Sequence, residues 1–367
     1  MPRELGPAKR LVVKVGTSSL VTPKGGVSRA RLARIVEQVA RAAKGRACVL
    51  VSSGAIAAGL GPLGATRRSK DIPGLQAAAA VGQGRLMAAY NEEFGRRRRV
   101  AAQVLLTQDD FAHRRQFVNA KNTFDRLLAA GAVPVVNEND TVATEEIRFG
   151  DNDRLAALVA IMVNADLLVL LSDVEGIHER DPRKGRSALV RELRDPASVQ
   201  ASGPHRGSGG MASKLEAATI ATSAGIGVVV ARAHRAGVLE AVLAGEEIGT
   251  YLPPADRRHR ARKAWIAFVR DVRGVLTVDA GAERALREDG RSLLAAGVKG
   301  IDGSFAAGDA VEIAGPSGRA FARGIVNYGA QELPALAGKT RAEIAALPGG
   351  PYDREVVHRD ELVVISP

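Results

Sequence analysis

The sequence has little cysteine and few aromatic residues. With one cysteine among 367 residues, Cys48, no intramolecular disulfide can form, which suits a reducing compartment. Cys48 lies in the apolar run CVLV, so we expect a buried small hydrophobe rather than a nucleophile. Aromatic residues make up 4% of the chain, so aliphatic side chains must fill the core. The sequence shows neither a signal peptide nor an apolar run of roughly 18 residues, so we expect a soluble, cytoplasmic protein with no membrane partner.

Positive charge, in contrast, is in excess. The formal net charge is +12, which is typical of proteins that bind nucleic acid. The excess is uneven, because residues 259–367 hold 15 Lys and Arg against 14 Asp and Glu. The charge is therefore concentrated in the first 258 residues, where phosphate-binding motifs also lie, and nucleic acid is not the partner we expect.

The first 258 residues alternate short apolar runs with stretches of helical spacing. The runs are apolar at every position, which is typical of parallel strands buried on both faces. Residues 28–43 have helical periodicity with Ser28 as N-cap, and further helices are expected at residues 154–163 and from Met211. The pattern predicts a three-layer α/β sandwich with a mostly parallel sheet. The predicted strands are 10–16, 47–51, 100–106, 133–136, 167–171 and 227–231.

The composition changes around residues 251–263, which are polar, basic and contain two prolines. We therefore predict a first domain at 1–258, a linker at 259–272 and a second domain at 273–367. Short alternating strands at 273–278, 309–313 and 321–326, with a helix at 282–288, predict that the second domain is small and mostly β.

Two motifs in the first domain are suited to binding anions. In VVKVGTSSL, Lys14 stands at the end of a buried strand and Gly16 allows close backbone approach, so a phosphate group is one explanation for this lysine. An edge-strand lysine that reaches solvent is the other. In SSGAIAAG, residues 52–59, hydroxyls and free N–H groups stand at a predicted helix start and could bind an anion. For this motif taken alone, an ordinary N-cap at Ser52 or Ser53 is the more common explanation.

Three further motifs follow predicted strands or precede a helix. The loop NENDTVATEEIRFGDND, residues 137–153, is rich in acids and amides and predicts recognition of a polar zwitterion. Ser172 and Asp173 stand at the end of a strand, where ligands bind in open α/β sheets. GSGGMASK, residues 207–214, is a glycine-rich loop with a lysine one turn into a helix, but it lacks the Walker A spacing. No histidine arrangement suggests a catalytic base.

Six blocks, KVGTSSL, SSGAIAAG, VGQGRLM, NENDTVAT, FGDND and GGMASK, resemble those of the amino acid kinase family in order and spacing. The resemblance covers nearly the whole chain and is closest to members that phosphorylate glutamate. Residues 273–367 resemble a PUA domain, through GVLTVDAGA and GSFAAGDAVEI. The resemblance therefore implies an amino acid kinase domain at 1–258 and a small mostly-β PUA-like barrel after the linker.

The resemblance also implies roles for individual residues. Lys14, Lys214 and Asp153 are the expected catalytic residues, with Asp153 orienting the two lysines. Ser172 stands where threonine is common, and Ala212 where a hydroxyl residue is common. The expected glutamate-binding residues are Ser53, Gly54, Asp140 and Asn152. The expected ATP-binding residues are Lys14, Gly16, Ser172, Asp173, Ser208, Gly209, Gly210, Met211, Ala212, Ser213 and Lys214.

The implied reaction is ATP-dependent phosphorylation of the γ-carboxylate of L-glutamate, the first step of proline biosynthesis. Mg²⁺ would arrive with ATP, and no protein ligand is assigned to it. The resemblance further implies feedback inhibition by proline, a homo-oligomer (dimer or tetramer) and handover of the product to a glutamyl phosphate reductase. Two alternatives stay open: a related carbamate or acetylglutamate kinase, and an additional RNA-binding role of the C-terminal domain.

Overall fold

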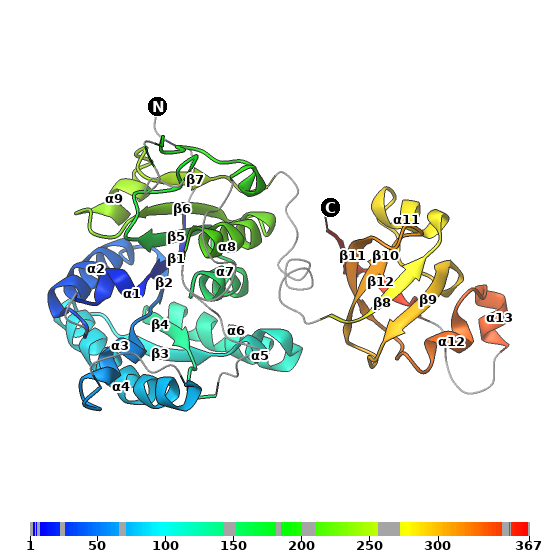
Figure 1. The fold of residues 1–367 in the computed structure, drawn as a ribbon, viewed down its shortest axis with the longest axis horizontal. Coiled ribbons are helices and arrows are strands. Elements are labelled where there is room, and N and C mark those ends of the chain that lie inside the picture. Colours follow the sequence, from blue (N-terminus) through cyan, green and yellow to red (C-terminus); the bar gives the residue numbers. More distant parts are fainter. Residues whose placement is uncertain are drawn as a thin grey trace. The chain divides into compact units, whose positions relative to one another are not determined.

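The computed structural model describes residues 3, 5, 8–22, 26–65, 71–142, 152–180, 185, 187–199, 210–255, 272–346, 352 and 354–365. The chain divides into two compact units, Met1–Arg258 and His259–Pro367 (Figure 1). Of the predicted linker, residues 259–271 lie outside the described residues, and residue 272 begins a strand of the second unit.

The first unit is built on a seven-stranded sheet in the order β3-β4-β2-β1-β5-β6-β7. Five of its strand pairs are parallel, and β6 with β7 is antiparallel. Strands β4 and β5 are buried at every position, as the continuous apolar runs predicted. The strands are β1 (Arg10–Val15), β2 (Ala47–Val51), β3 (Ala101–Leu106), β4 (Val133–Glu138), β5 (Leu167–Ser172), β6 (Gly227–Arg232) and β7 (Thr250–Leu252).

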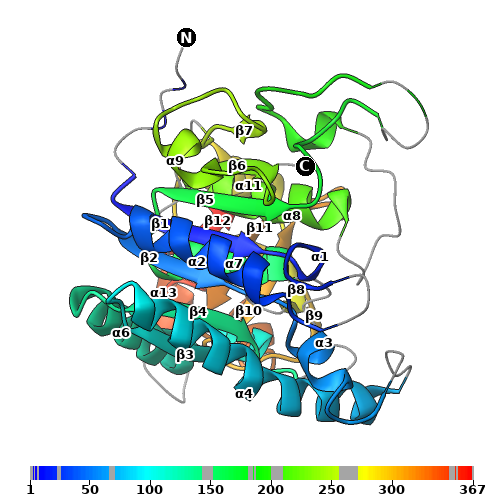
Figure 2. The same cartoon turned by 90° about the vertical axis from the view of Figure 1, so that its left-hand side faces the viewer.

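Helices cover both faces of this sheet (Figures 1 and 2), and the predicted three-layer α/β sandwich is confirmed. One face carries α1 (Thr17–Leu20), α2 (Arg29–Ala42), α3 (Ala55–Leu60), α4 (Ile72–Arg96) and α9 (Val238–Leu243). The other carries α5 (Gln108–Ala112), α6 (Arg114–Ala129), α7 (Asn152–Met162) and α8 (Met211–Ser223). No helix in the described part of the chain combines the length and apolar character needed to cross a membrane.

Local signals set several of these boundaries. Ser28 caps α2, because its side chain accepts a hydrogen bond from the backbone N–H of Arg31, as predicted. The long helix α4 ends at Arg96, and Arg97 binds the backbone carbonyl and the carboxylate of Glu93 one turn earlier. The composition change at residue 251 does not end the sheet, since Tyr251 lies in β7.

The second unit contains a five-stranded sheet in the order β12-β11-β10-β8-β9, which confirms the expected small, mostly-β unit. Among the described residues the end strands β12 and β9 are not paired, so the sheet is not a closed barrel. Its core includes Leu276, Ile313, Phe321 and Leu333. The elements are β8 (Val272–Val278), α11 (Ala280–Arg287), β9 (Val298–Gly303), β10 (Ala310–Ala314), β11 (Ala320–Val326), α12 (Leu333–Leu336), α13 (Arg341–Ala345) and β12 (Val357–Val364).

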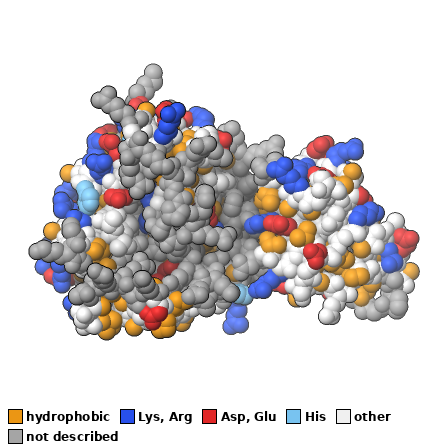
Figure 3. Space-filling model, viewed as in Figure 1, with side chains coloured by type: hydrophobic (Ala, Val, Ile, Leu, Met, Phe, Trp, Pro, Cys, Tyr) orange, Lys and Arg blue, Asp and Glu red, His pale blue; other side chains and the backbone are white. Residues whose placement is uncertain are grey.

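Charged side chains are distributed over the surface of the first unit. In Figure 3, Lys and Arg side chains lie along the left-hand edge of this unit, where Figure 1 places α2 and α9. The same edge carries carboxylates, and ion pairs join α2 to two neighbouring helices: Arg29 to Glu92 of α4, and Arg41 to Glu240 of α9.

Candidate active site

Lys14 lies in β1, between β2 and β5 in the middle of the sheet. Lys14 is only 2% exposed, so the alternative of an edge-strand lysine that reaches solvent is wrong. The Nζ atom of Lys14 lies 2.6 Å from Oδ1 of Asp153. A buried ammonium group requires such a partner, because desolvating an isolated charge costs several kcal/mol or more.

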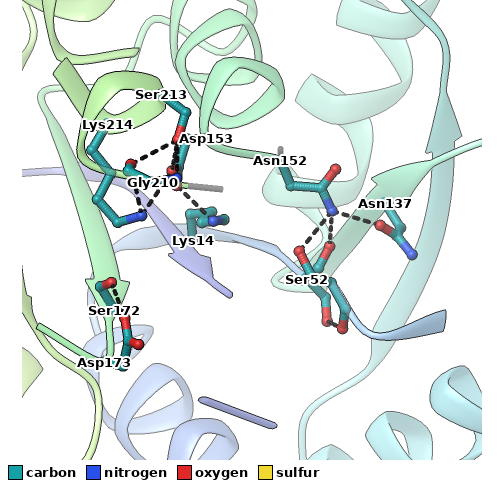
Figure 4. Close-up of polar contacts among 11 residues, drawn as sticks. Lys14, Ser52, Asn137, Asn152, Asp153, Ser172, Asp173, Gly210, Ser213 and Lys214 are labelled. Atoms are coloured by element: carbon teal, nitrogen blue, oxygen red, sulfur yellow. Dashed lines mark hydrogen bonds and ion pairs between the residues drawn. The ribbon is translucent and has the colours of Figure 1, made fainter. Parts of the chain in front are cut away.

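Asp153 also contacts the second lysine. It is the second residue of α7 and is fully buried, and its Oδ2 lies 3.1 Å from Nζ of Lys214 in the first turn of α8 (Figure 4). The hydroxyl of Ser213 lies 3.0 Å from the same oxygen. One carboxylate thus holds two ammonium groups that come from β1 and α8. Taken together, the three charged side chains carry a net charge of +1 in a desolvated place, which suits a polyanionic ligand.

A cluster of amides lies beside this charged group (Figure 4). The Nδ2 atom of Asn152 lies 3.0 Å from Oγ of Ser53 and 2.8 Å from Oδ1 of Asn137. It also donates to the backbone carbonyl of Ser52. Asn137 in turn donates to Oε1 of Gln83 in α4, at 2.8 Å. Since Asn152 and Asp153 are adjacent at the start of α7, the amide cluster and the lysine pair are held by one helix end.

The two serines before α3 have different environments. Ser53 contacts Asn152, whereas Oγ of Ser52 is 2.7 Å from the hydroxyl of Tyr90, which is completely buried. Burial raises the pKa of Tyr90, and the hydrogen bond with Ser52 partly opposes the rise. The N-cap of α3 is Gly54, with a φ of 104° in the left-handed region, so the alternative of Ser52 or Ser53 as an ordinary N-cap is wrong.

Other predicted residues stand at the same edge of the sheet. Gly16 follows β1, and a Cβ added there would lie 3.6 Å from Nζ of Lys14. Ser172 ends β5 and its hydroxyl donates to Oδ1 of Asp173 at 3.0 Å. Because β5 pairs with β1, this pair lies one strand from Lys14. Asp140 is half-buried in the turn after β4.

The glycine-rich loop is described only at its end. Gly210 is the N-cap of α8, and its backbone N–H donates to the hydroxyl of Ser213 at 3.1 Å. Met211 and Ala212 open the helix and are half-buried. Ser208, Gly209 and residues 143–151 of the acid-amide loop lie outside the described residues.

Two residues of this site had no individual role in the sequence prediction. Gln83 and Tyr90 both lie in α4, whose sequence pattern shows neither the hydrogen bond to Asn137 nor the one to Ser52. The block VGQGRLM includes Gln83 and was the only local signal for it.

The amino acid kinase family model matches residues 9–232, and the PUA domain model matches residues 274–347. This chain belongs to the amino acid kinase family. The match spans every residue of the lysine pair and the amide cluster described above. The second unit is a PUA domain by the same comparison.

Several curated relatives that are similar to this chain over nearly their full length are named glutamate 5-kinase. Glutamate 5-kinase from Streptomyces coelicolor is 51% identical, over 99% of this chain and 98% of the relative. Glutamate 5-kinase from Myxococcus xanthus is 47% identical, over 98% of this chain and 97% of the relative. Among solved structures, UMP kinase from Bacillus anthracis has a TM-score of 0.48 and 15% identity, over 69% of this chain and 98% of that structure.

Proposed function

We propose that this kinase transfers the γ-phosphoryl group of ATP to the γ-carboxylate of L-glutamate, the first step of proline biosynthesis. The observation that carries the proposal is the pair of lysines held by Asp153 next to the amide cluster of Asn152. The names of the relatives at about 50% identity support glutamate as the acceptor.

The nucleophile in this reaction is a carboxylate oxygen of glutamate. A carboxyl group with a pKa of about 4.3 is ionised at neutral pH, so no general base is needed. The oxygen forms a bond to the γ-phosphorus while the bond from that phosphorus to the bridging oxygen breaks, and ADP leaves. Repulsion between the two anions is the main obstacle, and the ammonium groups of Lys14 and Lys214 lower it.

The substrates would occupy two adjacent parts of the site. Lys14, Gly16, Lys214 and the start of α8 offer ammonium and N–H groups to phosphates, and Ser172 with Asp173 offers polar contacts to the rest of the nucleotide. Ser53, Gly54, Asp140 and Asn152 would hold glutamate. Both oxygens of Asp153 are engaged by lysines, so this carboxylate is not a suitable Mg²⁺ ligand. Mg²⁺ retains water readily and neutralises phosphate charge, so we expect it to bind mainly through ATP.

Trapping the acyl phosphate with hydroxylamine tests the reaction. Purified protein with ATP and Mg²⁺ should give hydroxamate with L-glutamate but not with L-aspartate or N-acetylglutamate. Hydroxamate formed with N-acetylglutamate in place of glutamate would show a related acid kinase, the alternative from the same family. A carbamate kinase would be detected as ATP formed from carbamoyl phosphate and ADP.

Several properties are inferred from the resemblance and the relatives alone. We expect inhibition by proline, a cytoplasmic homo-oligomer (dimer or tetramer) and transfer of the unstable product to a glutamyl phosphate reductase. Adding proline to the hydroxamate assay tests inhibition, and light scattering of the purified protein tests the oligomer.

The PUA domain leaves an additional RNA-binding role as a second candidate. The match to residues 274–347 favours it, whereas the balanced charge of residues 259–367, 15 basic against 14 acidic, speaks against a strong electrostatic contribution. Filter binding at several salt concentrations tests it. A steep loss of affinity with salt would support RNA as a partner.

A further inference from the structure

A cavity with a volume of about 280 Å³, lined mainly by charged and polar residues, lies between α2 and α9. Its walls are formed by α2, by the loop between β6 and α9, and by Ser19 of α1. These helices cover one face of the sheet, whereas α7 and α8, which carry Asp153 and Lys214, cover the other (Figures 1 and 2). The lining includes neither Lys14 nor Lys214. It borders two expected ATP-binding residues, because the backbone N–H groups of Ser19 and Ala233 donate to the carbonyls of Gly16 and Ser172.

The lining is predominantly cationic. Four arginines and His234 line the cavity, against two glutamates. Both glutamates, Glu37 and Glu240, pair with one arginine, Arg41, at 2.5 and 3.6 Å. Arg41 is thus the ion-pair partner of both carboxylates, although neither carboxylate oxygen of Glu240 has a hydrogen-bond partner among the described residues. Arg235 pairs with Glu246, which is not part of the lining, so Arg31 and Arg34 are the two arginines of the cavity to consider.

Arg31 and Arg34 are the two cations on α2 in this position. Within the described chain, the hydrogen bonds of Arg31 go to the backbone carbonyls of Ser18 and Val21, and that of Arg34 goes to the carbonyl of Ala30. Neither is paired with a carboxylate among the described residues. A guanidinium group has five N–H donors, so both arginines retain donors for an oxyanion.

Ser19 provides an independent observation. The residue is 1% exposed, and its Oγ atom has no hydrogen-bond partner in the part of the chain that the structure describes. A buried hydroxyl without a partner costs about 1–3 kcal/mol, and such groups are rare in folded proteins. Since Ser19 lines the cavity, a ligand with acceptor oxygens would satisfy this hydroxyl.

We propose that this cavity binds a small tetrahedral oxyanion of the phosphate type, with Arg31, Arg34 and the hydroxyl of Ser19 as its donors. Arginine matches the geometry of such an anion because two parallel N–H groups can reach two oxygens at once. The proposal goes beyond the kinase reaction and does not depend on it, because it concerns binding of the anion alone.

His234 supplies a reporter for occupancy. The pKa of His234 is lowered, mainly because the ring is partly desolvated by burial. The positive charges of Arg31, Arg34 and Arg232 lower it further, and the negative charge of Asp173 opposes the shift. Arg41, Arg235, Glu37 and Glu240 also line the cavity. A bound dianion adds negative charge beside the ring and therefore raises the pKa of His234.

The experiment follows the histidine ring signals of the full-length protein by NMR during a pH titration. Sodium sulfate is the probe, because sulfate stays a dianion across the range, and sodium chloride at equal ionic strength is the reference. The substitution His234→Gln identifies the signal. We expect sulfate to raise the pKa of His234 by roughly half to one pH unit. Equal pKa values in the two salts would overturn the proposal.

Matched variants distinguish a built site from general screening. Ser19→Ala removes the unpartnered hydroxyl, and Arg34→Gln removes an exposed cation, so both should fold. Each should weaken sulfate binding roughly tenfold, the value of one hydrogen bond to a charged group. Arg126→Gln, an exposed arginine of α6 on the other face of the sheet, removes the same charge and should keep the full response. An equal response in Arg34→Gln and Arg126→Gln would contradict the site.

A nucleotide added to the same titration identifies the source of the oxyanion. If the cavity takes a free oxyanion, the sulfate response should persist with a saturating non-hydrolysable ATP analogue. Loss of the response would mean that the phosphate tail of the nucleotide occupies the cavity, and this result would overturn a separate site. Failure of the kinase reaction itself would leave the sulfate result unchanged, so the two proposals fail independently.

Discussion

Nζ of Lys14 and Oδ1 of Asp153 lie 2.6 Å apart, and both side chains are almost completely buried. The other oxygen of the same carboxylate holds Lys214. Asp153 is thus the residue on which the positions of both lysines depend.

We therefore expect Asp153→Asn to be strongly destabilising and inactive. The substitution leaves two buried ammonium groups with a neutral partner, and breaking a buried pair in this way costs about 3–5 kcal/mol. Chemical denaturation and the hydroxamate assay measure the two effects. Asp125→Asn is the control, since Asp125 also bridges two cations, Arg10 and Lys121, but is partly exposed. Its cost should be about 1 kcal/mol or less. Equal losses in the two variants would refute the role of burial.

Lys214→Ala should lower kcat about a hundredfold or more with a modest change in the KM for glutamate. In the proposed mechanism the ammonium group lies near charge that develops on the transferring phosphoryl group, so its contribution should be larger in the transition state. Steady-state kinetics with varied glutamate measure both constants. Lys121→Ala, which removes a partly exposed lysine of α6, should leave them unchanged. Wild-type turnover in Lys214→Ala would remove this lysine from the reaction.

Tyr90→Phe tests whether α4 supports the glutamate site. The change removes the hydroxyl that lies 2.7 Å from Ser52, whose carbonyl accepts from Asn152. We expect a loss of about 1–2 kcal/mol in unfolding free energy and a higher KM for glutamate. Tyr328→Phe, which removes a hydroxyl bonded to Arg354 in the second unit, should leave the KM unchanged. An unchanged KM for glutamate in Tyr90→Phe would show that α4 does not support glutamate binding.

Gly82→Ala should destabilise the first unit by roughly 1–3 kcal/mol. A Cβ at Gly82 would lie 1.8 Å from the carbonyl oxygen of Ala55, so α3 and α4 would have to separate just after Ser53 and Gly54. Thermal unfolding and the KM for glutamate report the effect. Gly84→Ala in the same helix meets nothing within 4 Å and should stabilise by about 0.5–1 kcal/mol. A stabilised Gly82→Ala would show that the helices do not pack this closely.

Cys48 should be protected from alkylation in the folded protein. Burial raises the pKa of its thiol from 9.0 to about 12, so the reactive thiolate is scarce near pH 8. Iodoacetamide labelling with and without denaturant measures the protection. Rapid labelling of native protein would contradict it.

The same shift makes stability depend on pH. Because the folded state holds the proton of Cys48 more tightly than the unfolded state, the stability that this group contributes is present below pH 9 and falls as pH rises toward 12. Cys48→Ala should reduce the alkaline dependence of stability, and buried Tyr90, whose pKa is also raised, should keep the rest.

Much of the fold could be predicted because its signals are local. Buried parallel strands have continuous apolar runs, and Ser28 shows the start of α2 directly. The strand order is not a local property. The sequence left open whether Lys14 reaches solvent, since burial of this lysine depends on β1 pairing with both β2 and β5.

Contacts within the candidate site also depend on residues that are distant in the sequence, so the sequence alone could not predict them. The acid-amide pattern predicted Asn152 as a polar contact, but its neighbours Ser53 and Asn137 come from separate strand ends. The sequence did not predict that Tyr90 contacts the site, because a tyrosine inside an alanine-rich helix has the pattern of an ordinary core residue.

The position of β1 in the sheet has a consequence for synthesis of the chain. Lys14 is synthesised 200 positions before Lys214, and Asp153 lies between them. Such long-range contacts form slowly, since the loop between them must first close. A nascent chain that ends before Asp153 therefore has a central strand whose lysine lacks its counter-charge. We infer that the N-terminal half remains incompletely folded until α7 and α8 have been made, and that this enzyme gains stability and the proposed phosphate-binding lysines in one late step.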